Sequence, residues 1–335
     1  MIRKLLLLLA AGLLLLVLSL ALAAWRMHSV LQQPLQLSEE RLLIVESGAT
    51  PGGLLNRLES EGVLDGAFWL RLYWRFNLTG QPLHSGEYRL QPSQTARDLL
   101  GIWQRGEVVQ YSLTLVEGWT FKQVRQAIDR QDDVRHDSRD MAPGALMQAL
   151  GRAGQHPEGR FFPDTYRYAK GSSDLVLLQS ALKAMDAQLA QAWEARAPQS
   201  PLKSVDELLT LASIVEKETG VEADRGPVAA VFHNRLRIGM RLQTDPSVIY
   251  GLGDAFDGNL RKADLLHDTP YNTYTRPGLP PTPIAMPGRS SLQAAAVPPS
   301  SSALYFVAKG DGSSQFSATL EEHNRAVNRY QRTTP

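Results

Sequence analysis

The N-terminal segment constrains the fold of this chain most, because it is long enough to cross a membrane. Residues 5–24 carry no charge and are dominated by leucine. A helix of about 20 apolar residues spans a bilayer core about 30 Å thick. Trp25 and Arg26 follow, where interfacial residues commonly anchor such helices. The sequence therefore predicts a transmembrane helix at 5–24, after a short N-terminal segment, 1–4.

A cleaved signal peptide is the alternative interpretation of this segment. Ala21-Leu22-Ala23 resembles a small-x-small cleavage site. The apolar run is longer than the roughly 7–15 residues of a typical signal core, which favours a retained anchor. Both interpretations export the rest of the chain. Because Arg3 and Lys4 precede the apolar run, we expect the N-terminus to stay in the cytoplasm.

Composition narrows the class of the remaining chain. Of the 335 residues, 43% are hydrophobic and 21% are charged, so a packed core is expected, and the length suits about two domains. The 35 basic residues nearly balance the 34 acidic ones, so we expect no nucleic-acid partner. The absence of cysteine excludes disulfides, zinc–thiolate sites and thiol nucleophiles. No H-E-x-x-H pair or G-x-S-x-G elbow occurs, and we expect no metal site and no cofactor.

The apolar pattern divides the rest of the chain into three parts. Residues 25–40 contain a polar stretch without strong periodicity, which predicts a linker. Residues 41–106 combine short strand-like runs with amphipathic helices, which predicts a small α/β module. Residues 107–332 start with a strand and continue with longer helical patterns, which predicts a larger domain. The expected fold class is α+β, preceded by the membrane helix.

The segment LASIVEKETG, residues 211–220, places three charged residues at the end of an apolar run. Ser204 and Glu207 fit a capping box, which predicts a helix from about Val205. Gly220 is the residue type that commonly ends a helix. The segment therefore predicts a helix whose last turn is acidic.

Helical spacing gives the two glutamates of this turn different neighbours. Glu218 follows Leu211 and Ile214 on one face, whereas Glu216 lies on a less bulky face. Apolar surroundings and the helix dipole both disfavour a carboxylate at a C-terminal turn, and both raise its pKa. A raised pKa suits a general acid, so Glu218 is the candidate catalytic residue. The alternative is an ordinary solvated helix end, and we expect Glu216 to be solvated in either case.

Two later segments supply polar and aromatic groups of the kind that bind sugars. They are MRLQTDPSVIYG, residues 240–251, and TPYNTYTRPGLPPTPIAMPG, residues 269–288. Tyrosine combines a flat apolar face with a polar tip. The alternatives are structural: Asp245 as a helix cap, the proline-rich loop as a rigid linker, and Asp164 in FFPDTY as a turn residue. The candidate sugar-binding residues are Gln243, Asp245, Tyr271, Asn272 and Tyr274.

Several segments resemble, in their order along the chain, the endolytic murein transglycosylases of the YceG-like (MltG) family. They are EGRFFPDTY, LASIVEKETG, VAAVFHNRLRIGMRLQTDPSVIYG, YNTYTRPGLPP and LYFVAKGDGSSQFSATLEEHN. With the membrane helix, the resemblance covers nearly the whole chain. The sequence departs from the usual pattern at Thr282 and Gln315, where the family more often has glycine and histidine.

The resemblance implies a lytic transglycosylase of the cell inner membrane, with a cytoplasmic N-terminus and a periplasmic catalytic domain. Such enzymes cleave the MurNAc–GlcNAc bond of nascent peptidoglycan strands, leave 1,6-anhydro-MurNAc ends and terminate strand elongation. The family pattern makes Glu218 the general acid and then the base. It also implies that residues 41–106 are a LysM-like module, that 107–332 are the catalytic domain, and that cell-wall synthases are partners.

Two other functions remain open at this point. One is a hydrolytic muramidase, with Glu218 as the acid and Asp245 or Glu222 as the second carboxylate. The other is a non-catalytic peptidoglycan-binding scaffold that acts through residues 41–106.

Overall fold

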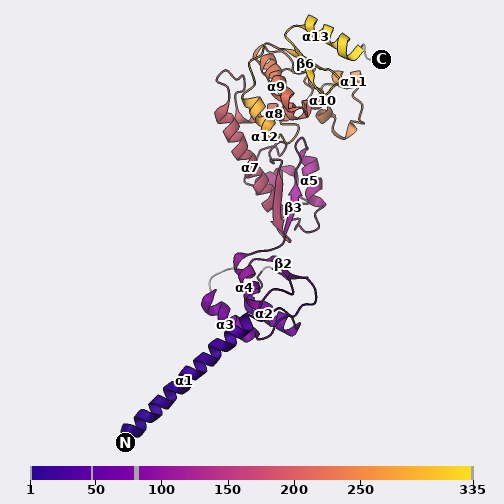
Figure 1. Ribbon diagram of the computed structural model, residues 1–335. Helices are drawn as coiled ribbons and strands as arrows, with labels where there is room; N and C mark the ends of the chain where they lie inside the picture. Colours follow the sequence, from indigo (N-terminus) through magenta and orange to yellow (C-terminus); the bar gives the residue numbers. More distant parts are fainter. Residues whose placement is uncertain (1, 47, 79–82, 333–335) are drawn as a thin grey trace. The chain divides into compact units, whose positions relative to one another are not determined.

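The computed structural model describes residues 2–46, 48–78 and 83–332, and its first element is a helix of 30 residues, α1 (Ile2–Leu31) (Figure 1). Within these ranges, α1 is the one helix that is long and apolar enough to cross a membrane. Its last two residues, Val30 and Leu31, are buried in a hydrophobic core against which Met27 also packs. The prediction of a linker over residues 25–40 is therefore wrong for its first part, since apolar residues three and four apart continue the helix.

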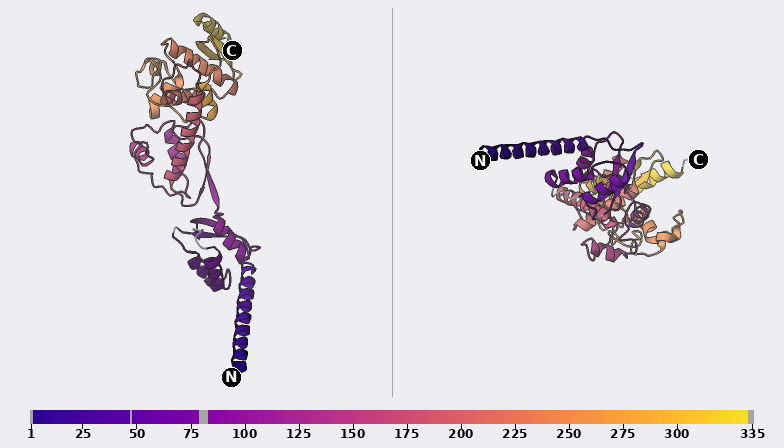
Figure 2. Two further views of the ribbon diagram at one scale, coloured as in Figure 1. Left: turned by 90° about the vertical axis from the view of Figure 1, so that its left-hand side faces the viewer. Right: turned by 90° about the horizontal axis from the view of Figure 1, so that it is seen from below.

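The rest of the chain divides into two units. Unit 1 contains the described residues up to Tyr111 and also Tyr168–Gly171. Unit 2 contains Ser112–Arg167 and the described residues from Ser172 onward. Strands β3 (Gln110–Thr114) and β4 (Thr165–Ala169) pair with each other and carry the chain across this boundary. The two views of Figure 2 show the same ribbon from other directions.

Unit 1 is built on a two-stranded antiparallel sheet covered by short helices. In the register of this sheet, Leu43 lies opposite Tyr88, and both side chains are buried. Alternate residues of the first strand, Leu42 and Ile44, face outward and are exposed, as the two-residue period of a strand requires. The elements of unit 1 after α1 are β1 (Arg41–Val45), α2 (Pro51–Ser60), α3 (Ala67–Asn77), β2 (Gly86–Leu90) and α4 (Ala96–Arg105).

Unit 2 is organised around helix α8 (Val205–Glu218). Residues 208–215 are all buried, and α8 contacts α7, α9, α10 and α12. The helix therefore has no solvent face along its middle, as expected for a helix that is apolar all round. The other helices of unit 2 are α5 (Phe121–Asp129), α6 (Pro143–Ala149), α7 (Asp174–Ala195), α9 (Glu222–Arg237), α10 (Asp245–Leu252), η1 (Gly253–Ala255), α11 (Lys262–Leu266), α12 (Arg289–Ala296), α13 (Leu320–Val327) and η2 (Asn328–Arg332).

Both ends of α8 can be traced to local sequence. The Ser204 hydroxyl accepts a hydrogen bond from the backbone N–H of Glu207 at 3.1 Å, and the helix begins at Val205, as predicted. At the other end Thr219 is extended, with φ of −146°. Gly220 follows the C-cap Thr219 at the C′ position, as predicted, but does not adopt the positive φ that is common for glycine there. The extended Thr219 is what turns the chain away directly after Glu218.

A small hairpin lies near the C-terminal end of the described chain. Strands β5 (Tyr305–Ala308) and β6 (Ser314–Ser317) are antiparallel, and Phe306 pairs with Phe316 in their register. Helix α13 contacts both strands. This hairpin and helix provide one wall of the site described below.

Candidate functional site

The side chain of Glu218 lines a cavity of about 490 Å³ within unit 2. Its lining residues come from α8, α9 and the start of α10, and from β5, α13 and η2 much later in the chain. Segments about a hundred residues apart in sequence thus line the same cavity as Glu218. The polar or aromatic side chains that line the cavity are Glu218, Arg235, Gln243, Asp245, Tyr274, Tyr305, Phe306, His323 and Gln331.

The environment of Glu218 favours the protonated carboxylic acid. Burial raises the pKa of Glu218 to about 7, and the nearby charge of Asp245 acts in the same direction. A hydrogen bond from the Thr244 hydroxyl to Oε1 of Glu218 acts in the opposite direction, as does the charge of Arg235. The net result is an acid that still holds its proton close to neutral pH, which is the property expected of a general acid.

The chain segment before α10 is held in a strained conformation beside this acid. Among the residues that the structure describes, Gln243 is the only non-glycine residue with a positive φ, at 48°. Two backbone hydrogen bonds to Thr273 fix the segment. The N–H of Gln243 donates to the Thr273 carbonyl at 3.2 Å, and the N–H of Thr244 donates to the Thr273 hydroxyl at 3.0 Å. This conformation directs the hydroxyl of Thr244 to Glu218 and leaves the side chain of Gln243 exposed in the cavity. Such strain is typical of functional sites.

Asp245 and Tyr274 form a second polar pair in the cavity. The Tyr274 hydroxyl donates to Oδ1 of Asp245 at 2.5 Å. Asp245 is the first residue of α10, and the N-cap position belongs to Thr244, which makes no side-chain cap bond. The structural alternative, in which Asp245 caps this helix, is therefore not supported. Its carboxylate faces the cavity instead.

Arg235 was not singled out by the sequence, although it lines the same cavity. Its side chain is buried, and its guanidinium donates to the carbonyls of Leu304 at 2.7 Å and Leu242 at 2.6 Å. The guanidinium carbon lies 5.4 Å from the ring centroid of Tyr305, and that ring stacks on His323 at 5.2 Å. The available sequence signal was an arginine between the apolar residues of the VFHNRL segment, but Leu304 and Tyr305, which contact it, lie about 70 residues later in the chain.

The other two candidate sugar-binding residues lie elsewhere. Asn272 is buried, and its amide organises the loop by donating to carbonyls such as that of His267, at 2.7 Å, and accepting from the N–H of Tyr274, at 2.8 Å. The Tyr271 hydroxyl bonds to the Thr282 hydroxyl at 2.8 Å. Neither side chain lines the cavity that contains Glu218. Both instead hold the loop that delivers Tyr274.

Tyr271 packs against Tyr250, which is hydrogen-bonded to a second, buried acid, Glu158. Its ring packs edge-on against Tyr250, with centroids 4.8 Å apart, and the Tyr250 hydroxyl donates to Oε2 of Glu158 at 2.9 Å. Glu158 also accepts the backbone N–H of Phe121 at 2.9 Å, and burial raises its pKa to about 7. The EGRFFPDTY segment therefore contributes a buried anchor for α10. Asp164 of the same segment accepts the N–H of Thr165 at 2.7 Å, as a turn residue does.

Glu216 contradicts the expectation that it is solvated. Only 7% of its side chain is exposed, and its Oε2 accepts the backbone N–H of Gly288 at 2.9 Å. A guanidinium nitrogen of Arg225 lies 3.9 Å from its other oxygen. The prediction failed because the less bulky face of α8 is also covered at its last turn, where Gly288 and Arg225 lie against Glu216.

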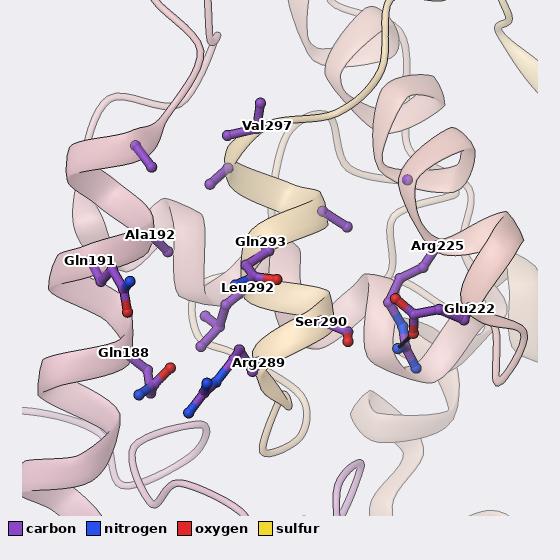
Figure 3. Close-up of a pocket in the computed structure, with 14 residues that line it drawn as sticks. Gln188, Gln191, Ala192, Glu222, Arg225, Arg289, Ser290, Leu292, Gln293 and Val297 are labelled. Carbon is purple, nitrogen blue, oxygen red and sulfur yellow. Dashed lines mark hydrogen bonds and ion pairs between the residues drawn. The ribbon is translucent and has the colours of Figure 1, made fainter.

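A second cavity, of about 440 Å³, lies between α7, α9 and α12 (Figure 3). Glu222 lines this cavity and pairs with Arg225, as the dashed line in Figure 3 marks. It does not line the cavity that contains Glu218. Of the two residues considered as a second carboxylate, only Asp245 is thus placed beside Glu218. Within residues 2–46, 48–78 and 83–332, no group of three or more His, Asp or Glu side chains is arranged to hold a metal ion.

Comparison with known proteins gives one consistent family. The model of the YceG-like family matches residues 43–329. A protein of Bacillus subtilis named endolytic murein transglycosylase is 37% identical over 210 residues, which is 62% of this chain and 58% of the relative. A protein of the same name from Streptococcus pneumoniae serotype 2 is 30% identical over 308 residues, which is 81% of this chain and 54% of the relative. The chain thus spans little more than half the length of these relatives.

A solved structure supports the same relationship. The crystal structure of a YceG-like protein from Listeria monocytogenes superposes with a TM-score of 0.54 at 32% sequence identity. The match covers 86% of this chain and 99% of that one.

Proposed function

Because the chain belongs to the YceG-like family, we propose that it is a lytic transglycosylase that cleaves peptidoglycan strands internally, with Glu218 as its catalytic acid. The observation that carries this proposal is the position of Glu218: a carboxyl group with a pKa near 7, inside a polar and aromatic cavity. The names of the relatives from B. subtilis and S. pneumoniae support the substrate class.

One carboxyl group is sufficient for this reaction. Glu218 donates its proton to the glycosidic oxygen between MurNAc and GlcNAc, and the bond from that oxygen to C1 of MurNAc breaks. The resulting carboxylate accepts the proton of the MurNAc C6 hydroxyl while the C6 oxygen bonds to C1. The product carries a 1,6-anhydro ring, and the acid is restored. The nucleophile belongs to the substrate, so no activated water is needed.

The other cavity residues suit the binding of a sugar and the stabilisation of positive charge. Gln243 offers an exposed amide, and Tyr274 presents a ring next to the acid. The carboxylate of Asp245 would stabilise an oxocarbenium-like state at C1, while its charge also raises the pKa of Glu218. A hydrolytic muramidase would use Asp245 as a second carboxylate to activate water, so product chemistry separates the two mechanisms.

The N-terminal helix α1 supports a membrane location. The length and apolar composition of α1 suit a membrane span, and its uncharged run exceeds the roughly 7–15 residues of a signal-peptide core, which favours retention of the helix. We propose a single-pass protein of the inner membrane, with a cytoplasmic N-terminus and unit 2 in the periplasm. Residues 41–106 are proposed to act as a LysM-like glycan-binding module. Association with cell-wall synthases is proposed on family grounds alone.

The decisive test is the product of the purified full-length protein on isolated glycan strands. Mass spectrometry should find 1,6-anhydro-MurNAc ends, formed at internal positions. Reducing MurNAc ends would show a hydrolase instead. No cleavage under conditions that support a related transglycosylase would favour the scaffold.

A further inference from the structure

Helix α3 of unit 1 exposes an apolar stripe that the catalytic function does not use. The side chains of Phe68 and Phe76 are 59% and 73% exposed. Together with the half-buried Leu72 they occupy positions i, i+4 and i+8, so they form one continuous face. Exposed aromatic residues in a row are uncommon on a soluble surface and usually mark a contact site.

The opposite face of α3 accounts for the folding of the helix. Ala67 and Leu70 are fully buried, and Trp74 packs against the same hydrophobic core. The exposed stripe is therefore not needed to hold the helix in unit 1. It remains available for a partner outside the described chain.

Two arginines lie beside the stripe. Arg71 and Arg75 are exposed and are spaced three residues after Phe68 and Leu72. A helix that shows aromatic residues next to arginines is typical of a surface that binds at the boundary between lipid head groups and acyl chains. Arginine adds attraction to anionic lipids.

The position of α3 relative to α1 points to the same partner. The two helices, which Figure 1 shows side by side, are in contact. Val30 of α1 lies directly against Gly66, the N-cap residue of α3. Val30 is six residues beyond the apolar run that ends at Ala24, which corresponds to about 9 Å along a helix. The polar head-group layer on each side of a bilayer is about 5–8 Å thick. The start of α3 is therefore held close to the outer boundary of that layer.

We propose that the Phe68–Leu72–Phe76 face of α3 binds the surface of an anionic phospholipid bilayer. It would act as a second membrane contact that fixes the orientation of unit 1 on its anchor. This inference rests on the proposed retention of α1 as a membrane span.

The absence of cysteine from the sequence makes the test direct. Single-cysteine variants of the full-length protein at Phe68, Phe76, Ile238 and Leu16 would carry a nitroxide label in phosphatidylethanolamine–phosphatidylglycerol vesicles. Ile238 is a matched control, because it is 62% exposed and lies in unit 2. Leu16 reports the insertion of α1. Collision rates with oxygen and with a water-soluble nickel complex measure depth in the bilayer.

The expected result is that labels at positions 68 and 76 lose nickel accessibility severalfold on reconstitution, while the label at 238 does not. Removing the anionic lipid, or changing Arg71 and Arg75 to glutamine, should reduce this protection. If position 16 is protected and positions 68 and 76 stay as accessible as 238, the membrane contact is refuted and a protein partner becomes the occupant to consider. If position 16 is also accessible, the anchor itself fails. Unchanged thermal unfolding of each variant would show that the labels leave the fold intact.

Discussion

Glu216 and Glu218 lie two residues apart at the end of α8, and the structure gives them opposite tasks. Glu216 is enclosed, accepts the backbone N–H of Gly288 and lies near Arg225, so its charge is used inside the fold. Glu218 is only half-buried, receives a single hydroxyl donor from Thr244 and lines an open cavity. The difference shows that burial alone does not make a catalytic acid. A carboxyl group must also lack strong cationic and N–H partners and face the space where a substrate can bind.

The largest effect is expected from Glu218→Gln. Loss of the proton donor should lower the rate of strand cleavage by about 10²–10⁴-fold, the usual contribution of a general acid. Quantifying anhydro-muropeptides released from purified strands measures this. Glu222→Gln is the matched control, because Glu222 is exposed and lines the other cavity. The activity of the Glu222→Gln variant should stay within about twofold of wild type. Equal losses in the two variants would remove Glu218 from the mechanism.

The same variant should not lose stability in alkaline solution. Because the folded-state pKa of Glu218 is raised from 4.5 to about 7, the wild-type protein binds more protons than its unfolded chain over that interval. This contribution to stability is present below pH 4.5 and is lost as the pH rises to about 7. Glutamine carries no charge, so at pH 8 the variant should unfold at the same or a higher temperature by calorimetry. A clear fall in that temperature would mean that the carboxylate of Glu218 supports the fold.

Glu216→Ala should lose stability, whereas Glu218→Gln should lose activity and keep its stability. The buried N–H of Gly288 loses its acceptor, and Arg225 loses a nearby charge, so the free energy of unfolding should fall by about 1–3 kcal/mol. Calorimetry of the full-length protein in detergent measures the change. Glu216→Gln retains an acceptor oxygen and should recover part of the loss. A stable Glu216→Ala protein without activity would contradict the division of tasks between the two glutamates.

The pH profile of activity separates the two carboxyl groups further. Since the reaction starts from the protonated acid, kcat/KM should fall about tenfold per pH unit above an apparent pKa near 7. Glu216→Ala should keep this alkaline limb at the same pH. A profile that rises through pH 8 would show that the acid form of Glu218 is not the active one.

The smallest expected effect concerns Thr244→Val. The hydroxyl donates to Glu218 and lowers its pKa, so removing it should raise that pKa further. The alkaline limb should then move up by as much as about one pH unit, which corresponds to about 1.4 kcal/mol. Thr244→Ser retains the hydroxyl and should restore the wild-type profile. A shift to lower pH would contradict the assigned role of this bond.

Local sequence patterns predicted several elements of the fold. The apolar run of residues 5–24 predicted a helix, and the Ser204 cap correctly placed the start of α8 at Val205. The structure contains α5 and α7 over the ranges Phe121–Asp129 and Asp174–Ala195, where helical patterns occur in the sequence. These features depend on neighbours within a few residues, and so a single sequence is sufficient to infer them.

The site was predicted only in part, because its members come from distant segments. Glu218, Gln243, Asp245 and Tyr274 do line one cavity. Asn272 and Tyr271 have the same residue types as good sugar ligands, but their hydrogen bonds hold the loop. Arg235 was missed, since its role depends on Leu304 and Tyr305. Residue type alone does not distinguish a ligand from a support.

The sequence by itself determined the apolar N-terminal helix, the helix that carries the two glutamates, and the residue types available near them. Only the tertiary structure decided which glutamate is enclosed and which faces a cavity. The physical reason is that helix periodicity sets directions around a single axis. Whether a direction leads to water, to another helix or to a cavity depends on α9, α10 and α12, which contact α8, and on β5 of the C-terminal hairpin, which lines the cavity with Glu218.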